Sequence, residues 1–231
     1  MVKRRGAVNR RPRLGPPREP KLPAELRPAG DMQRELEHEQ TVEAAAYGDV
    51  DLAGALAEGV VFDRCAFRRT GLAGAHLPSV RFIDCVVEAS DLSNVRAERA
   101  RLERVALSGC RATGLACNDG LLSDVVFVDC KVDLTNWRFA WFDVVTFESC
   151  NLAGADFTEA DLRGASFTGC DLSGAQFHKA TMAGTRFRRC ELQGVGGITS
   201  WQGAIVHPDD LLELSYILAG ALGIVVERAD Q

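Results

Sequence analysis

Cysteine is the residue type in this sequence with the widest chemistry, because its thiolate can bind a metal, attack a substrate or form a disulfide. The chain has eight cysteines. Cys65 and Cys85 are twenty residues apart, and a second set recurs at intervals of twenty: Cys110, Cys130, Cys150, Cys170 and Cys190. The sequence contains no Cys-x-x-Cys pair, the usual arrangement of a redox or zinc site. This spacing predicts that the cysteines occupy equivalent positions of a repeating backbone.

The other candidates for chemistry do not form a recognisable site. The four histidines make no pair at the spacing of metal ligands: His38, His76, His178 and His207. Gly194, Gly196 and Gly197 do not follow a buried strand that opens into a helix, as a phosphate-binding loop requires. We therefore expect a protein that is not an enzyme, with no catalytic residue, no bound metal and no cofactor.

The cysteines belong to a five-residue repeat, which is clearest between Asn151 and Leu192. Large apolar residues occupy every fifth position: Leu152, Phe157, Leu162, Phe167, Leu172, Phe177, Met182, Phe187 and Leu192. A helix has a period of 3.6 and a strand a period of 2, so the chain must turn a corner once in every five residues. We call the large apolar residue the centre. The residue two positions earlier, usually Ala or Cys, should point to the same side and is called the inward residue.

The repeat extends over most of the chain. All 29 centres from Leu52 to Leu192 are apolar, and none of the 29 inward residues is charged. Because like residues recur every twenty positions, four five-residue sides complete one coil, which predicts a rod of square cross-section. Coils stacked ~4.8 Å apart would give seven coils and a length of roughly 35 Å. The interval of 25 between Cys85 and Cys110 means either that the cysteine column moves to the next side or that five residues form a loop.

The position of the cysteines in this repeat predicts buried thiols. Seven are inward residues, and Cys117 is a centre. Free buried thiols fit a reducing compartment, although stacked cysteines ~4.8 Å apart would also be within reach of a disulfide. The sequence has no run of eighteen apolar residues and no secretory signal, so we expect a cytoplasmic protein without a membrane span.

The repeat units ADFTE, ADLRG and CDLSG match the consensus A(D/N)LXX, and on these residues the chain resembles the pentapeptide-repeat protein family. The resemblance covers residues 50–195. It implies an all-β solenoid, a right-handed quadrilateral β-helix, and the residues on either side of the repeat add short N- and C-terminal helices to this expectation. For function it implies little, because most members of this family have no assigned role.

The N-terminal residues differ from the repeat in composition. Residues 1–30 are rich in Pro and Arg and hold nine basic and two acidic residues. With almost nothing to bury, they are expected to be a disordered tail, either simply solvated or a tether for nucleic acid or an acidic partner. Residues 31–49 contain strong helix formers, and we expect a helix over residues 31–47 that covers the first coil.

Residues 196–231 are predicted to form the C-terminal cap. A helix should start near His207, with Asp209 or Asp210 at its cap. The helix is apolar almost all round, so one side can close the last coil while the other forms a homodimer. The predicted interface is Leu211, Leu214, Ile217 and Leu218. This ending resembles the C-terminal dimerisation module of the quinolone-resistance pentapeptide proteins of Qnr and MfpA type.

Two surfaces of the rod are candidates for binding a partner. Apolar residues interrupt the polar outer positions between residues 115 and 147, and we expect either a binding patch or a local loop that hides them: Leu121, Val126, Phe139, Trp141 and Val144. Residues 116–175 hold ten acidic and three basic residues. The ten acidic residues are expected to spread over all four sides of the rod, and five of them, facing solvent, are predicted to act together in binding a partner: Asp119, Asp124, Asp143, Asp156 and Asp161.

These surfaces support two hypotheses about function. The first is a non-enzymatic rod or adaptor that binds an unidentified protein through the apolar residues. The second follows from the resemblance to Qnr and MfpA: a modulator of DNA gyrase or another type II topoisomerase that mimics DNA and protects against quinolones or gyrase poisons. Over three coils, duplex DNA carries roughly eight charges, comparable to the net −7 of residues 116–175.

Overall fold

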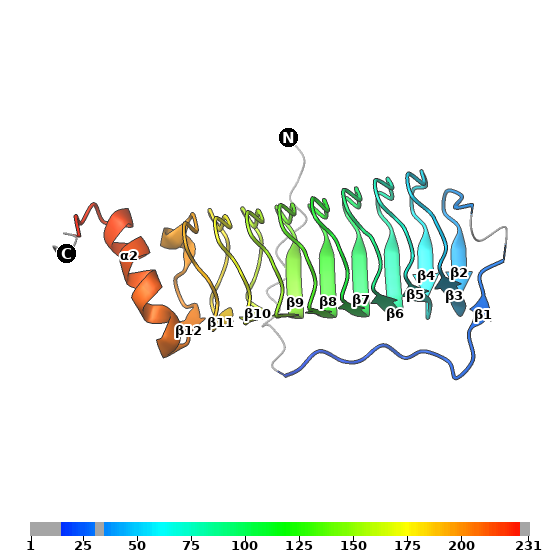
Figure 1. Ribbon diagram of the computed structural model, residues 1–231, viewed down its shortest axis with the longest axis horizontal. Coiled ribbons are helices and arrows are strands. Elements are labelled where there is room, and N and C mark those ends of the chain that lie inside the picture. The colour runs from blue at the N-terminus through cyan, green and yellow to red at the C-terminus, as the bar shows by residue number, and fades with distance from the viewer. Residues whose placement is uncertain (1–14, 31–34, 227–231) are drawn as a thin grey trace.

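The computed structural model describes residues 15–30 and 35–226, and these form a long rod of stacked coils ending in a helix (Figure 1). Twelve strands form one parallel sheet that winds along the rod. The strands are β1 (Arg27–Pro28), β2 (Thr41–Glu43), β3 (Ala45–Gly48), β4 (Val61–Asp63), β5 (Ala66–Arg68), β6 (Arg81–Glu88), β7 (Arg101–Ser108), β8 (Leu121–Val128), β9 (Trp141–Glu148), β10 (Ala165–Thr168), β11 (Arg186–Arg188) and β12 (Ile205–Val206). The helices are η1 (Ile198–Ser200), η2 (Pro208–Asp210) and α2 (Leu211–Ala221). No helix of the described residues is long and apolar enough to cross a membrane.

The register confirms the square coil of twenty residues. Leu121 pairs with Arg101 on one side and Trp141 on the other. The same offset holds between Cys85 and Val105, so no loop separates Cys85 from Cys110. The cysteine column therefore moves to the next side of the rod, and the loop interpretation is wrong.

The long strands β6 to β9 each cover two neighbouring sides of the coil, with a bend between them. The bend falls at a residue with a positive φ, between 51° and 57°: Asp84, Arg104, Asp124 and Val144. We call this column the strand corner. Non-glycine residues rarely adopt such a φ, so the stacking of the coils must hold the strand corner in place.

The core consists of the predicted centres and inward residues, packed as continuous stacks. Phe157 and Phe177 lie face to face with ring centroids 5.2 Å apart, and Phe147 and Phe167 are 5.1 Å apart. Trp137 is buried among them, and its indole Nε1 donates a 2.7 Å hydrogen bond to the inward residue Thr135. A single core runs the length of the rod.

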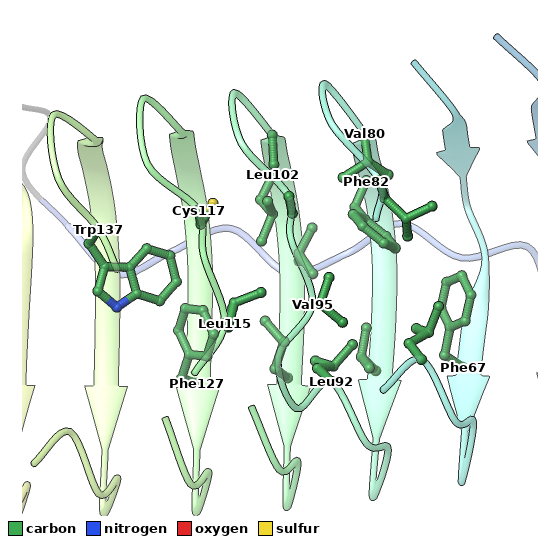
Figure 2. A pocket seen from close by; sticks show the side chains of 17 residues that line it. Phe67, Val80, Phe82, Leu92, Val95, Leu102, Leu115, Cys117, Phe127 and Trp137 are labelled. Atoms are coloured by element: carbon green, nitrogen blue, oxygen red, sulfur yellow. The ribbon is translucent and has the colours of Figure 1, made fainter. Parts of the chain in front are cut away.

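The packing is incomplete at one place in this core. An apolar cavity of about 60 Å³ extends across several coils (Figure 2). Phe82 and Leu102 line it and are only half-buried, although both are centres and the repeat predicts that centres lie in the interior. The reason is a shortage of side-chain volume, because eight consecutive centres between Phe82 and Phe127 include no aromatic residue.

The predicted N-terminal helix over residues 31–47 is wrong for its described part. Thr41–Glu43 and Ala45–Gly48 are strands β2 and β3. Val42 and Tyr47 continue the five-residue phase, and the Tyr47 ring stacks on Phe67 with centroids 4.7 Å apart. Stacking on the next coil thus overrides the helix propensity of this segment.

Residues 15–30 are an ordered N-terminal strap, which corrects the expectation of a disordered tail for this part; residues 1–14 lie outside the described residues. The strap runs along the strands from the region of β9 back to the first coil (Figure 1). There β1 pairs with β3, and Ala29 N donates a 2.9 Å hydrogen bond to Ala46 O. The strap, rather than a helix, therefore covers the edge of the first coil.

Candidate protein-interaction surfaces

The cysteine columns are part of the core. All eight cysteines are buried free thiols, and Cys110 Sγ donates to Val87 O at 3.4 Å. Burial raises the pKa of the Cys117 thiol to about 12 and also raises the pKa of Cys85. No three histidine, cysteine, aspartate or glutamate side chains in the described residues are arranged to hold a metal ion. The positions of the cysteines are those of packing residues.

The structure brings together three of the five residues predicted for the apolar patch. Leu121 and Trp141 are register neighbours on β8 and β9, and Phe139 lies at the corner just before Trp141. Leu121 is 39% exposed, Phe139 is 47% exposed and Trp141 is half-buried. The Arg138 guanidinium lies over the Phe139 ring, 5.7 Å from its centroid. We call Leu121, Phe139 and Trp141 the Trp141 patch.

The other two predicted patch residues lie elsewhere. Val126 is half-buried on the second half of β8, across the strand corner from Leu121. Val144 is buried in the strand corner itself. Neither contributes to the Trp141 patch, because the bend at Asp124 and Val144 turns the two halves of each strand onto different sides of the rod.

The predicted acidic surface is less free than the sequence suggests. Asp124 is fully buried, and its carboxylate accepts hydrogen bonds from the backbone N–H and the guanidinium of Arg18 in the strap. The prediction that Asp124 faces solvent is therefore wrong, because a segment 106 residues away in sequence covers it.

Two of the remaining four acidic residues have basic partners. Asp161 forms an ion pair with Arg163 at 2.6 Å, and Asp156 forms one with Arg138 at 3.3 Å. Asp143 accepts a 3.3 Å hydrogen bond from Ser123 Oγ, and Asp119 is exposed. Both arginines belong to residues 116–175 and are already counted in the net −7, so only the pairing of the buried Asp124 with Arg18 lowers the exposed charge of this segment.

The C-terminal end of the rod is closed by carboxylates that the sequence interpretation missed. In earlier coils an N–H such as that of Gly169 donates to a carbonyl of the next coil. At the last coil, Arg189 N and Cys190 N donate instead to the carboxylate of Asp210, both at 2.9 Å. Asp210 stands at the predicted helix cap but makes no side-chain cap hydrogen bond to α2. The sequence did hold a signal for this role, because Asp210 stands twenty residues, or one coil, after Cys190.

Helix α2 has one face on the rod and one face exposed. Leu214 is buried, and Ile217 packs against the core. Leu211 and Leu218, also predicted for the dimer interface, are 53% and 43% exposed. The predicted set therefore divides into two residues that close the last coil and two that remain available.

Comparisons with known proteins concern the fold. Residues 100–177 and 140–197 match the family model for the pentapeptide repeat region. Comparison with curated proteins gives no match. One similar solved structure is that of QnrB1, described as a plasmid-mediated fluoroquinolone resistance protein. The two sequences are 21% identical, the alignment covers 83% of this chain and 97% of QnrB1, and the TM-score is 0.36. HetL from the cyanobacterium Nostoc sp. strain PCC 7120, described as involved in the regulation of heterocyst differentiation, is 18% identical, with 73% of this chain covering 87% of it and a TM-score of 0.38.

Proposed function

This chain is a pentapeptide-repeat protein, and from that premise we propose that it is a non-enzymatic rod or adaptor that binds a protein partner through the Trp141 patch. The observation that carries the proposal is the pairing of Leu121 with Trp141 on the outside of the rod, in a column that holds Arg81, Arg101 and Asp161 in the coils to either side. Exposed aromatic residues grouped with an arginine are the typical centre of a protein interface. Arg138 over the Phe139 ring supplies that combination.

The surroundings of the patch support an interface. The register places Arg101 directly before Leu121 and Asp161 directly after Trp141, so charges of opposite sign flank the apolar residues. A polar rim around an apolar centre is the usual composition of a non-obligate interface.

The test compares two substitutions of exposed or half-exposed apolar residues. Trp141→Ser should weaken binding of the partner by tenfold or more, since buried interface tryptophans typically contribute at least ~2 kcal/mol. Leu56→Ser is the matched control, because Leu56 is 69% exposed and lies near the other end of the rod. The partner is isolated by cross-linking in cells, purified, and its Kd measured by calorimetry. Equal Kd values for the wild type and Trp141→Ser would refute the role of the patch.

The second candidate function is a DNA-mimicking modulator of DNA gyrase. It is supported by the excess of acidic residues in 116–175, but Asp124, Asp156 and Asp161 each pair with an arginine. A supercoiling assay with purified gyrase separates the candidates. A DNA mimic should lose its effect on gyrase when Asp119 and Asp143 become Asn, and it should keep the effect in Trp141→Ser. Absence of any effect at low salt would remove this candidate.

We further propose that the chain forms a homodimer through the exposed face of α2. Leu212 and Tyr216 are 72% and 58% exposed, together with Leu211 and Leu218. So many large apolar side chains on one helix would be costly in water for a monomer. The oligomeric state decides this proposal directly.

A further inference from the structure

The N-terminal strap has a three-residue period in both sequence and burial. Pro17, Pro20, Pro23 and Leu26 are three residues apart, and all four are half-buried. Most residues between them are exposed, and residues 16–26 form no helix or strand. A polyproline II helix has three residues per turn and no internal hydrogen bonds. The pattern indicates a polyproline II segment with one proline-lined face against the rod.

A column of outward apolar residues runs along β3, β5 and the second halves of β6, β7 and β8, on the side of the rod that the strap follows (Figure 1). The register aligns Ala46, Ala66, Val86, Ala106 and Val126 in successive coils. We call these five residues the apolar column. Ala66 is buried and the other four are half-buried, although all face away from the core. Leu22, Pro23 and Leu26 of the strap line one crevice with Ala46 and Ala66.

Two carboxylates of the strand corner fix the position of the strap. Arg18 N and its Nε donate to Asp124 at 2.8 and 2.9 Å, and Lys21 N donates to Asp84 at 3.0 Å. Asp84 is held from the other side by the Arg104 guanidinium at 2.6 and 2.7 Å, and this hydrogen bond lowers the pKa of Asp84.

The spacing of these carboxylates fits one turn of a polyproline helix. Asp84 and Asp124 are two coils apart, which corresponds to ~9.6 Å at the usual strand spacing. Arg18 and Lys21 are three residues apart, and three polyproline II residues rise ~9.3 Å. A segment in this conformation can therefore contact alternate coils with every third residue, and Pro23 lines the crevice formed with Ala46 and Ala66 of the apolar column.

We propose that the apolar column, Asp84 and Asp124 form a docking site for proline-rich segments of a partner protein that adopt the polyproline II conformation and carry an arginine. The N-terminal strap is the resident ligand of this site in the structure. A partner segment with prolines at every third position and arginine after the first of them, as in Pro17-Arg18-Glu19-Pro20, takes its place. The preformed polyproline conformation keeps the entropic cost of docking low.

The test uses the full chain with the substitutions Pro17→Gly, Arg18→Glu and Pro20→Gly, which remove contacts of its own strap with the rod. We call this variant the disarmed chain. The probe is a fluorescent peptide with the native sequence of residues 15–30, and binding is followed by anisotropy. The peptide should bind the disarmed chain about 30-fold or more tightly than the wild type, whose tethered strap competes at millimolar effective concentration. A peptide with Arg18→Glu should not bind.

A matched pair of substitutions locates the site. In the disarmed chain, Asp124→Asn should weaken peptide binding at least tenfold, and Asp129→Asn should leave it unchanged. Both residues have a similar positive φ, 55° and 51°, which Asn tolerates, but Asp129 is exposed and lies away from the strap contacts. Equal loss in the two variants would overturn the proposed site.

Thermal unfolding of the disarmed chain supplies the remaining control. If this chain melts close to the wild type and still does not bind the peptide, the docking site does not exist. If the disarmed chain melts far below the wild type or aggregates, the strap is a permanent part of the rod, and the proposal is equally overturned.

Discussion

Filling the internal cavity should stabilise the rod, and Ala97 is the position to fill. Ala97 is a centre that lines the cavity, and the residue twenty positions earlier in the same column is Leu77. The backbone of this column therefore accepts a leucine. Filling 60 Å³ at ~24 cal/mol per Å³ recovers about 1.4 kcal/mol. Burying three more carbons at ~0.8 kcal/mol each sets an upper limit of about 2.4 kcal/mol.

We expect Ala97→Leu to raise the free energy of unfolding by about 1–2 kcal/mol. For a chain of this size that corresponds to an increase in Tm of roughly 3–6 °C. Urea unfolding followed by circular dichroism measures the free energy, and calorimetry measures Tm.

Ala112→Leu is the matched control for this prediction. Ala112 is also a buried centre, but it does not line the cavity. Its replacement should overpack the core and destabilise the rod by about 1–3 kcal/mol. The reasoning is refuted if the two variants change stability in the same direction and by similar amounts, because the cavity would then not distinguish them.

Three further predictions follow from the core and the C-terminal end. In the folded chain the buried Cys117 thiol has a pKa of about 12, whereas in the unfolded chain it ionises near pH 9, so the free energy of unfolding should fall as the pH rises from 9 to 12. Cys117→Ala should make this fall shallower. An unchanged slope of the free energy against pH, measured by urea unfolding, would contradict this. Static light scattering should report twice the chain mass for the wild type and the monomer mass for Leu212→Glu with Leu218→Glu, and a monomeric wild type would reject the dimer. Asp210→Ala should leave the N–H groups of the last coil unpaired, cost about 2 kcal/mol and speed hydrogen exchange at Cys190, whereas unchanged exchange there would show that Asp210 does not close the rod.

The repeat made the core predictable residue by residue. The period of five assigns each centre from Leu52 to Leu192 to the interior without knowledge of the three-dimensional contacts, and the period of twenty assigns its neighbour in the next coil. The same two periods also pointed to features that the interpretation missed. Val42 and Tyr47 are in phase with the centres, and Asp210 is in phase with Cys190.

The strap and its effects could not be predicted from composition. Residues 15–30 have too few apolar residues to form a core of their own, and the carboxylates that hold Arg18 and Lys21, Asp124 and Asp84, are more than 60 residues away. A corner position such as Asp124 normally faces water in this repeat, so its burial becomes visible only when the strap is placed. The signal that remained in the sequence was the three-residue spacing of Pro17, Pro20 and Pro23, which differs from the spacing in the rod.

The strap also gives the rod a mechanical polarity. In a solenoid each coil touches only its neighbours, so opening begins at an end and proceeds one coil at a time. At the N-terminal end the first coil is tied through the strap to Asp124 on β8, so opening it requires release of contacts made several coils away. At the C-terminal end the last coil is held by η2 and α2 through local contacts such as Asp210 with Cys190. A pulling force applied to both ends should therefore unwind this rod from its C-terminus.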